Sequence, residues 1–330
     1  MSLTDEGLVP VEGIASRWVR LANGAKAHYA TAGDTGPAIV LLHGGLPGSS
    51  GVAGWRLMMP FLASHGFRVY APDRPGFGLS DTREEFWPRE GFVSWTQFIG
   101  DFVDALCLDE FYLAGNSQGA GCTSYYVVNN PGRVKRFVLI ATAVFNSTLG
   151  IDPSQLTAGI SANNDKYDGT PEGMRKLLEP IIYRKEGLAH EVLEMRSRAA
   201  NAQRDSFASA ANFTRTGPKD PAYAHWLNLK GKIDQVGVPG IYLYGRDDVL
   251  SPVDNAYLQE DQLPNIQVFY PAECGHQGQT DQPEMFNQAV LEFFRDGRVS
   301  RKTADWAGVS TRRPEIESLV EPAAAGAPAG

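Results

Sequence analysis

A serine in a short glycine-flanked motif is the first residue in this chain whose surroundings indicate chemistry. Ser117 lies in Gly115-Asn-Ser-Gln-Gly119, which fits the pattern G-x-S-x-G. The pattern alone also arises by chance, but here a strand-like run, 111–114, precedes it and a helical segment, 119–128, follows it. A serine on a sharp turn between a strand and a helix is exposed for attack on a carbonyl carbon. We therefore predict that Ser117 is a nucleophile.

A serine nucleophile needs an imidazole as its base and a carboxylate that holds this imidazole in the required tautomer. His276 follows the apolar run 266–270, and the pair Asp247-Asp248 follows the run 241–244. We predict His276 as the base and Asp248, deeper in its loop, as the acid. Asp247 is then a turn residue or a surface charge. The resulting chain order is Ser, Asp, His.

Attack on a carbonyl creates an oxyanion, for which two backbone N–H donors must be in place. We expect one from Gln118, the residue after the nucleophile. The second is expected from the loop His43-Gly-Gly-Leu-Pro-Gly48, which follows the apolar run 38–42. Gly45 is the first choice there and Leu46 the second. The alternative is that this loop is only a tightly packed turn.

Eight short apolar runs, separated in the first half by helical patterns, must position these loops. Runs such as 38–42 are apolar at every position, as in parallel strands that are buried on both faces. Strands alternating with helices predict an α/β fold with a mostly parallel, doubly wound sheet. The expected strands are 18–21, 27–32, 38–42, 67–71, 111–114, 136–141, 239–244 and 266–270.

The alternation of strands and helices breaks in the middle of the chain and ends before the C-terminus. Residues 144–232 are helix-rich without a strong strand, and we expect them to form a helical lid inserted into the sheet domain. The core then consists of 1–143 and 233–297. Residues 298–330 end in a sequence of Ala, Pro and Gly, which predicts a flexible tail.

Composition excludes several classes of function. The chain has 330 residues, of which 43% are hydrophobic and 21% charged, and its net charge of −8 argues against a nucleic-acid partner. The three cysteines form no Cys-x-x-Cys pair, and no cluster has metal-ligand spacing. No nucleotide-binding glycine motif is present. We expect no cofactor, no metal, no membrane span and a cytoplasmic protein.

The motifs together resemble the α/β-hydrolase superfamily, over the chain up to about residue 298. Within it, they are most similar to the meta-cleavage product hydrolases, which cut a C–C bond in ring-fission products of aromatic degradation. The matching segments are His43-Gly-Gly45 with Pro47-Gly48, Asp73-Arg-Pro-Gly-Phe-Gly-Leu-Ser80, Gly115-Asn-Ser-Gln-Gly119, Gly245-Arg-Asp-Asp248 with Pro252, and Cys274-Gly-His276.

Two positions depart from the pattern of that family. Gln277 stands where the family has a tryptophan after the catalytic histidine, and Gln118 stands where it has Met or Leu. The resemblance also implies that Arg196 holds a substrate carboxylate, with Arg198 as a nearby competitor and a solvated helix face as the alternative for both. Further expected substrate contacts are Gly44, Leu46, Asn116 and Gln277.

The resemblance implies hydrolysis of a C–C bond in a small hydrophobic or aromatic-derived substrate. Spacing alone does not separate this reaction from ester or lactone hydrolysis, because both use the same triad. A serine at position 117 argues against the superfamily members that use an aspartate nucleophile, and it leaves cofactor-free peroxidase chemistry open. A non-catalytic small-molecule receptor on the same fold is a third alternative. A homodimer also stays open.

Overall fold

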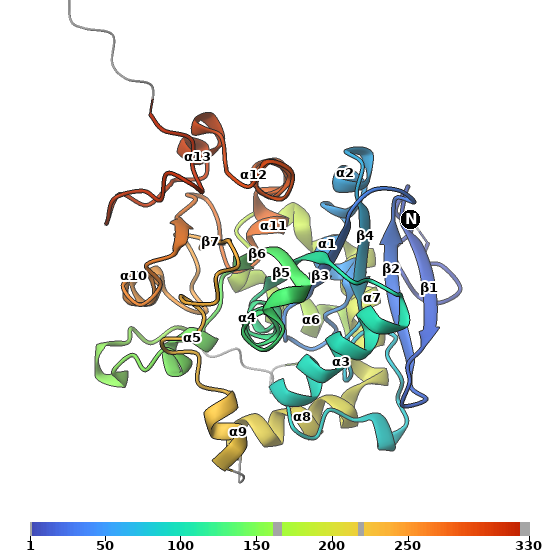
Figure 1. Ribbon diagram of the computed structural model, residues 1–330. Coiled ribbons are helices and arrows are strands. Elements are labelled where there is room, and N and C mark those ends of the chain that lie inside the picture. The colour runs from blue at the N-terminus through green and yellow to red at the C-terminus, as the bar shows by residue number, and fades with distance from the viewer. Residues whose placement is uncertain (1, 161–166, 217–220, 324–330) are drawn as a thin grey trace, which may run out of the picture.

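The computed structural model describes residues 2–160, 167–216 and 221–323. Its centre is an eight-stranded sheet in the order β1-β2-β4-β3-β5-β6-β7-β8 (Figure 1). Strands β1, β2 and β4 pair antiparallel, and every pairing from β4 to β8 is parallel. The strands are β1 (Ala15–Arg20), β2 (Lys26–Ala32), β3 (Ala38–Leu42), β4 (Arg68–Pro72), β5 (Phe111–Asn116), β6 (Val134–Ile140), β7 (Gly240–Leu243) and β8 (Ile266–Phe269).

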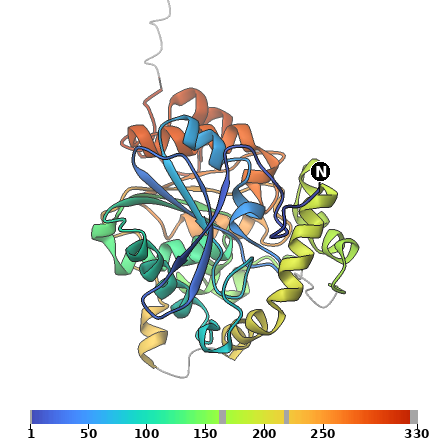
Figure 2. The same cartoon turned by 90° about the vertical axis from the view of Figure 1, so that its right-hand side faces the viewer.

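Helices cover both faces of the sheet, which confirms the predicted α/β class. Every residue of β3 and β5 is buried, because these central strands pack against helices on each side. Figure 2 shows the two helix layers on opposite sides of the strands. One apolar core lies under α2 (Met59–Ser64), α12 (Pro283–Asp296) and α13 (Arg301–Trp306), and the other under α3 (Phe92–Ala105), α4 (Gln118–Asn129) and α10 (Val253–Glu260).

A helical segment lies between β6 and β7, where the sequence predicts the lid. Among the described residues it contains α5 (Val144–Thr148), α6 (Pro171–Leu178), α7 (His190–Ala202), α8 (Arg204–Thr216) and α9 (Pro221–Trp226). The predicted lid positions 161–166 and 217–220 lie outside the described residues. In Figure 2 this segment lies beside the sheet, and α7 contacts α1 (Gly51–Trp55), which follows the β3 loop.

The expectation of a flexible tail from residue 298 is wrong for 298–323. This segment forms α13 and returns to the sheet, where Val309 bridges Phe269 of the edge strand β8. Arg312 and Arg313 form ion pairs with the buried Glu260. The prediction extended the low-complexity composition to the whole segment, but the Ala, Pro and Gly residues are concentrated at the very end of the chain. Residues 324–330 lie outside the described part of the chain.

Candidate active site

Ser117 occupies the turn between β5 and α4 in a strained backbone conformation, with φ 57° and ψ −120°. A non-glycine residue adopts positive φ at an energetic cost, and such strain is common at active sites. The two flanking positions must be glycine because a side chain there would clash with neighbouring backbone. A Cβ on Gly115 would lie 2.2 Å from the carbonyl oxygen of Gly119, and one on Gly119 would lie 2.2 Å from that of Leu42. The turn therefore depends on both glycines of the motif.

His276 and Asp248 lie in line with this serine. The His276 Nε2 atom is 2.8 Å from Ser117 Oγ, and its Nδ1 atom is 2.7 Å from Asp248 Oδ2. Both residues are 3% exposed, so their interaction is little screened by water. With Nδ1–H donating to the carboxylate, Nε2 is free to accept the serine proton. The geometry is that of a proton relay from hydroxyl to imidazole.

The adjacent aspartates have different environments. Asp248 is buried, and its second oxygen accepts the N–H groups of Leu250 and Ser251 at 2.9 and 3.0 Å. Asp247 is exposed, and its carboxylate accepts the N–H of Cys274 at 3.2 Å. Asp248 thus orients the imidazole, while Asp247 ties the β7 loop to the loop that carries His276.

The backbone of His276 is held from two sides. Its N–H donates to the carbonyl oxygen of Ile181, in the inserted helical segment, at 2.9 Å. Its carbonyl oxygen accepts the side-chain amide of Asn116 at 3.0 Å. The preceding Gly275 donates its N–H to the buried Asp281 at 2.8 Å. Asn116 therefore positions the base, and its expected contact with the substrate stays a prediction.

The two residues expected to supply the oxyanion donors, Gly45 and Gln118, lie next to each other. A Cβ on Gly45 would be 2.6 Å from Gln118 Cδ, so the two segments are in close contact. Within the described residues, no acceptor is found for the N–H of Gly45 or of Gln118. Gly44 lies next to the nucleophile, since a Cβ there would be 3.5 Å from Ser117 Cβ. Leu46 packs against the apolar cluster of the inserted segment.

His43 is buried under this loop and does not reach the triad. Its Nδ1 atom lies 2.7 Å from the carbonyl oxygen of Gly44, and its Nε2 atom accepts the N–H of Arg74 at 3.1 Å. Burial, together with the charge of Arg74, lowers the pKa of His43 to about 3. The imidazole is therefore neutral at physiological pH and serves as a fixed hydrogen-bonding bridge.

The competing arginines of α7 point in different directions. Arg196 is 3% exposed and donates to Ser49 Oγ at 3.2 Å, while its Nε atom finds no partner among the described residues. Burial and the neighbouring Arg56 lower the pKa of Arg196 to about 10. Arg198 is on the outer face of the helix and pairs with Glu194 at 2.6 Å. Of these two arginines, Arg196 is the buried one, and it has unused hydrogen-bonding capacity.

Two glutamines lie close to the triad. Gln277 directly follows His276 and is 8% exposed. Gln118 follows Ser117, and its Oε1 atom is buried without a partner in the part of the chain that the structure describes. Both residues directly follow a triad residue and carry a carboxamide, which can form hydrogen bonds that an apolar side chain cannot.

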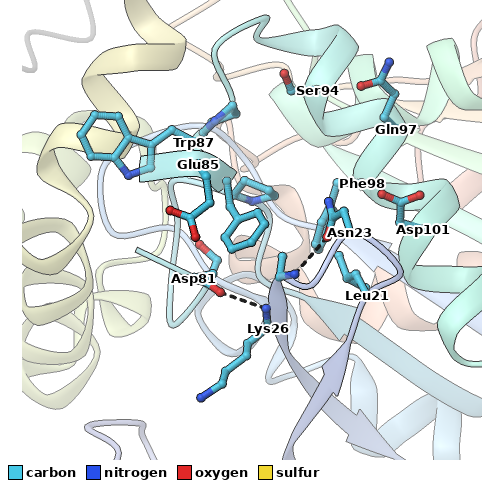
Figure 3. Close-up of a pocket in the computed structure, with 15 residues that line it drawn as sticks. Leu21, Asn23, Lys26, Asp81, Glu85, Trp87, Ser94, Gln97, Phe98 and Asp101 are labelled. Atoms are coloured by element: carbon cyan, nitrogen blue, oxygen red, sulfur yellow. Dashed lines mark hydrogen bonds between the residues drawn. The ribbon is translucent and has the colours of Figure 1, made fainter. Parts of the chain in front are cut away.

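A surface hollow lies away from these residues, between the β1–β2 turn and α3 (Figure 3). Asp81 in its wall accepts the backbone N–H of Lys26 at 3.0 Å. Its lining also includes the aromatic Trp87 and the acidic Glu85, together with apolar and polar side chains. It contains no triad residue, and we assign it no part in the chemistry.

Neither a metal-binding group nor a membrane-spanning helix is found among the described residues. No group of three or more His, Cys, Asp or Glu side chains in the described residues has an arrangement suited to a metal ion. None of the helices in the described ranges is both long enough and apolar enough to cross a membrane.

Comparison with known proteins identifies the family. Residues 37–283 match the α/β hydrolase fold family. A 2-hydroxy-6-oxononadienedioate/2-hydroxy-6-oxononatrienedioate hydrolase of Paraburkholderia phymatum is 30% identical, over 86% of this chain and 96% of the relative. A 2-hydroxy-6-oxo-2,4-heptadienoate hydrolase of Pseudomonas putida is also 30% identical, over 83% and 94%.

Solved structures agree with the sequence matches. A meta-cleavage product hydrolase from Pseudomonas fluorescens superimposes with a TM-score of 0.69 at 27% identity, covering 86% of this chain and 98% of that one. The similarity thus extends over most of this chain and nearly all of that structure. The chain belongs to the α/β-hydrolase fold family, and it is a hydrolase related to the meta-cleavage product hydrolases.

Proposed function

We propose that this enzyme hydrolyses the C–C bond next to the 6-oxo group of a 2-hydroxy-6-oxo-dienoate, with Ser117 as nucleophile. The observation that carries the proposal is the Ser117–His276–Asp248 relay, in a chain whose relatives are named for this class of substrate. Such a substrate is a small, aromatic-derived acid, and its carboxylate needs a cationic partner in the site.

Arg196 supplies that partner in the proposed complex. Its guanidinium is buried, and its Nε atom has no partner among the described residues, so a carboxylate would complete its hydrogen bonds. A buried cation without a counterion is costly, and a bound anion offsets that cost. The charge of Arg56 nearby adds to the attraction.

The proposed reaction begins with a proton shift. The 2-hydroxy-dienoate ketonises, so that the electron pair of the breaking bond has a conjugated carbonyl to receive it. His276 then takes the proton of Ser117 Oγ, and this oxygen attacks the 6-oxo carbon. The N–H groups of Gly45 and Gln118 stabilise the oxyanion. Collapse breaks the C–C bond, the dienolate fragment leaves as it is protonated, and water hydrolyses the acyl-enzyme.

The test is to mix the protein with a coloured ring-fission product and follow the loss of visible absorbance, with Ser117→Ala in parallel. Bleaching by the wild-type enzyme and its loss in Ser117→Ala are expected. No bleaching, together with turnover of aryl esters or lactones that depends on Ser117, would contradict the C–C assignment. It would make ester or lactone hydrolysis the function of the same triad.

A further inference from the structure

Arg74 is a fully buried cation that the proposed mechanism does not use. It lies directly after β4, and its side chain is 0% exposed. No carboxylate in the described residues forms an ion pair with it, and the neighbouring Asp73 bonds His28 instead. Burying an unpaired guanidinium is expensive, so its hydrogen bonds must be favourable and well aligned.

Those hydrogen bonds converge on the loop after β3. One terminal nitrogen of Arg74 donates to the carbonyl oxygens of His43 at 2.8 Å and Gly44 at 2.9 Å. The other lies 3.2 Å from Cys122 Sγ in α4. The rings of Phe77 and Trp95 lie 5.0 and 5.1 Å from the guanidinium carbon, within the range of cation–π attraction. Both terminal nitrogens of the planar group are thus held, while its Nε atom has no partner among the described residues.

The carbonyl of Gly44 therefore points toward Arg74. The same oxygen lies 2.7 Å from His43 Nδ1, so two donors fix the direction of this peptide. In a trans peptide the C=O of one residue and the N–H of the next are antiparallel. The N–H of Gly45 must then point away from Arg74. Gly45 lies against Gln118, since a Cβ on Gly45 would be 2.8 Å from Gln118 Cβ, so the two expected oxyanion donors belong to residues in contact.

We infer that Arg74 is the positioning residue of the oxyanion hole: it holds the Gly44–Gly45 peptide so that the Gly45 N–H faces the carbonyl that Ser117 attacks. This inference rests on the proposed serine mechanism. It also selects Gly45 over Leu46 as the second donor, because the peptide before Gly45 is the one whose carbonyl Arg74 fixes. The neutral His43 ring also holds this peptide, because its Nδ1 atom bonds the Gly44 carbonyl while its Nε2 atom accepts the backbone N–H of Arg74.

The test compares Arg74→Met and Arg74→Lys with the wild-type enzyme, using an aryl ester and the matching thiono ester. A correctly aimed oxyanion hole discriminates strongly between them, because sulfur accepts hydrogen bonds weakly and its bond to carbon is longer. Arg136→Met is the matched control. Arg136 also donates to a backbone carbonyl, that of Phe294, and lies over the ring of Tyr112, but it is near the start of β6, away from Ser117.

We expect Arg74→Met to lower kcat for the oxo ester about 10- to 100-fold, less than the full loss of a donor, with KM changed less than about twofold. The ratio of oxo to thiono turnover should fall toward one. Arg74→Lys should lie between, because it keeps the charge without the forked geometry. Arg136→Met should leave the ratio unchanged even if it lowers Tm.

Equal losses for both esters in the Arg74 variants, or an unchanged kcat, would overturn the inference. If Arg74→Met fails to fold, the test rests on Arg74→Lys, whose ratio of oxo to thiono ester turnover must still be lower than that of the wild-type enzyme. The dienoate assay is run separately on the wild-type enzyme. Failure there with normal ester turnover removes the proposed substrate and leaves the role of Arg74 to be judged on the esters. A wild-type enzyme that hydrolyses neither the dienoate nor either ester contradicts both proposals.

Discussion

At the scale of single residues, the neighbouring Asp247 and Asp248 show how strongly one loop position matters. Asp248→Asn should lower kcat by about 10⁴-fold, because an amide stabilises the wrong histidine tautomer and no imidazolium. Asp247→Asn is the matched control and should change kcat less than about tenfold, since the hydrogen bonds of Asp247 within the described residues go to the backbone of Cys274 and not to the imidazole. Steady-state kinetics of the two variants measures the difference. Comparable losses in both would show that the acid is misassigned.

Arg196 and Arg198 provide a second matched pair at this scale. Arg196→Gln should raise KM for a dienoate substrate about 10- to 100-fold, because a charge-assisted hydrogen bond is lost in a buried site. Turnover of a neutral ester should change little. Arg198→Gln removes only an exposed pair with Glu194 and should leave both substrates unaffected. An equal effect of Arg196→Gln on neutral and anionic substrates would argue against a carboxylate contact.

At the scale of elements, the buried Asp73 joins β4 to its surroundings. Its carboxylate accepts the N–H groups of Gly51 at 2.7 Å and Leu79 at 2.8 Å, and it lies 2.7 Å from His28 Nδ1. Burial alone would raise the pKa of Asp73, but the charge and hydrogen bond of His28 outweigh it, so the pKa lies below its usual 3.8. This carboxylate thereby fixes the start of α1, the β2 strand and the β4 loop to one another.

The lowered pKa of Asp73 gives a sign for the pH dependence of stability. A carboxyl group whose pKa is lower in the folded state stabilises the fold above its unfolded pKa, and this contribution disappears as pH falls through the folded pKa. Asp73→Asn should lower the free energy of unfolding by about 3 kcal/mol at pH 7. The difference from wild type should shrink below about pH 4. Denaturant unfolding of wild type and variant at pH 7 and below about pH 4 measures this difference in unfolding free energy. A difference that is the same at the two pH values would refute the lowered pKa of Asp73.

At the scale of the whole molecule, residues 298–323 cover the edge strand β8. The N–H of Tyr270 donates to the carbonyl of Gly308 at 2.7 Å, and Ser310 donates its N–H to Val268 at 2.9 Å. Ser300 and Thr303 bond the carboxylate of Glu292 in α12. The segment therefore protects an edge that would otherwise expose unpaired backbone groups.

Truncation tests this role. Ending the chain after residue 297 should lower Tm by several degrees or more and promote aggregation, because it exposes the β8 edge and leaves the buried Glu260 without Arg312 and Arg313. Removal of only 324–330 is the control and should leave Tm within about one degree. Thermal unfolding and size-exclusion chromatography report the outcome. A stable, monodisperse protein of residues 1–297 would show that the segment is dispensable.

Much of the arrangement follows from local sequence. The eight predicted strands all exist, with 38–42 correct at both ends and the others shifted at one or both ends. Apolar runs without polar interruptions indicate the central strands that are buried on both faces. The strand–turn–helix around Ser117 also follows, since Gly115 and Gly119 act within a few residues.

The sequence by itself determined the sheet, the nucleophile turn and the order of the triad, because each depends on periodicity or on contacts between near neighbours. Only the tertiary structure decided which buried groups support them. Asn116 bonds the carbonyl of His276 across 160 positions, and Arg74 reaches Cys122 across 48. The inward direction of Arg196 is settled by packing of α7 on the β3 loop, where Gly48 lies against its backbone. Hydrogen bonds of this range leave no local pattern in a chain, because their partners become neighbours only when the fold forms.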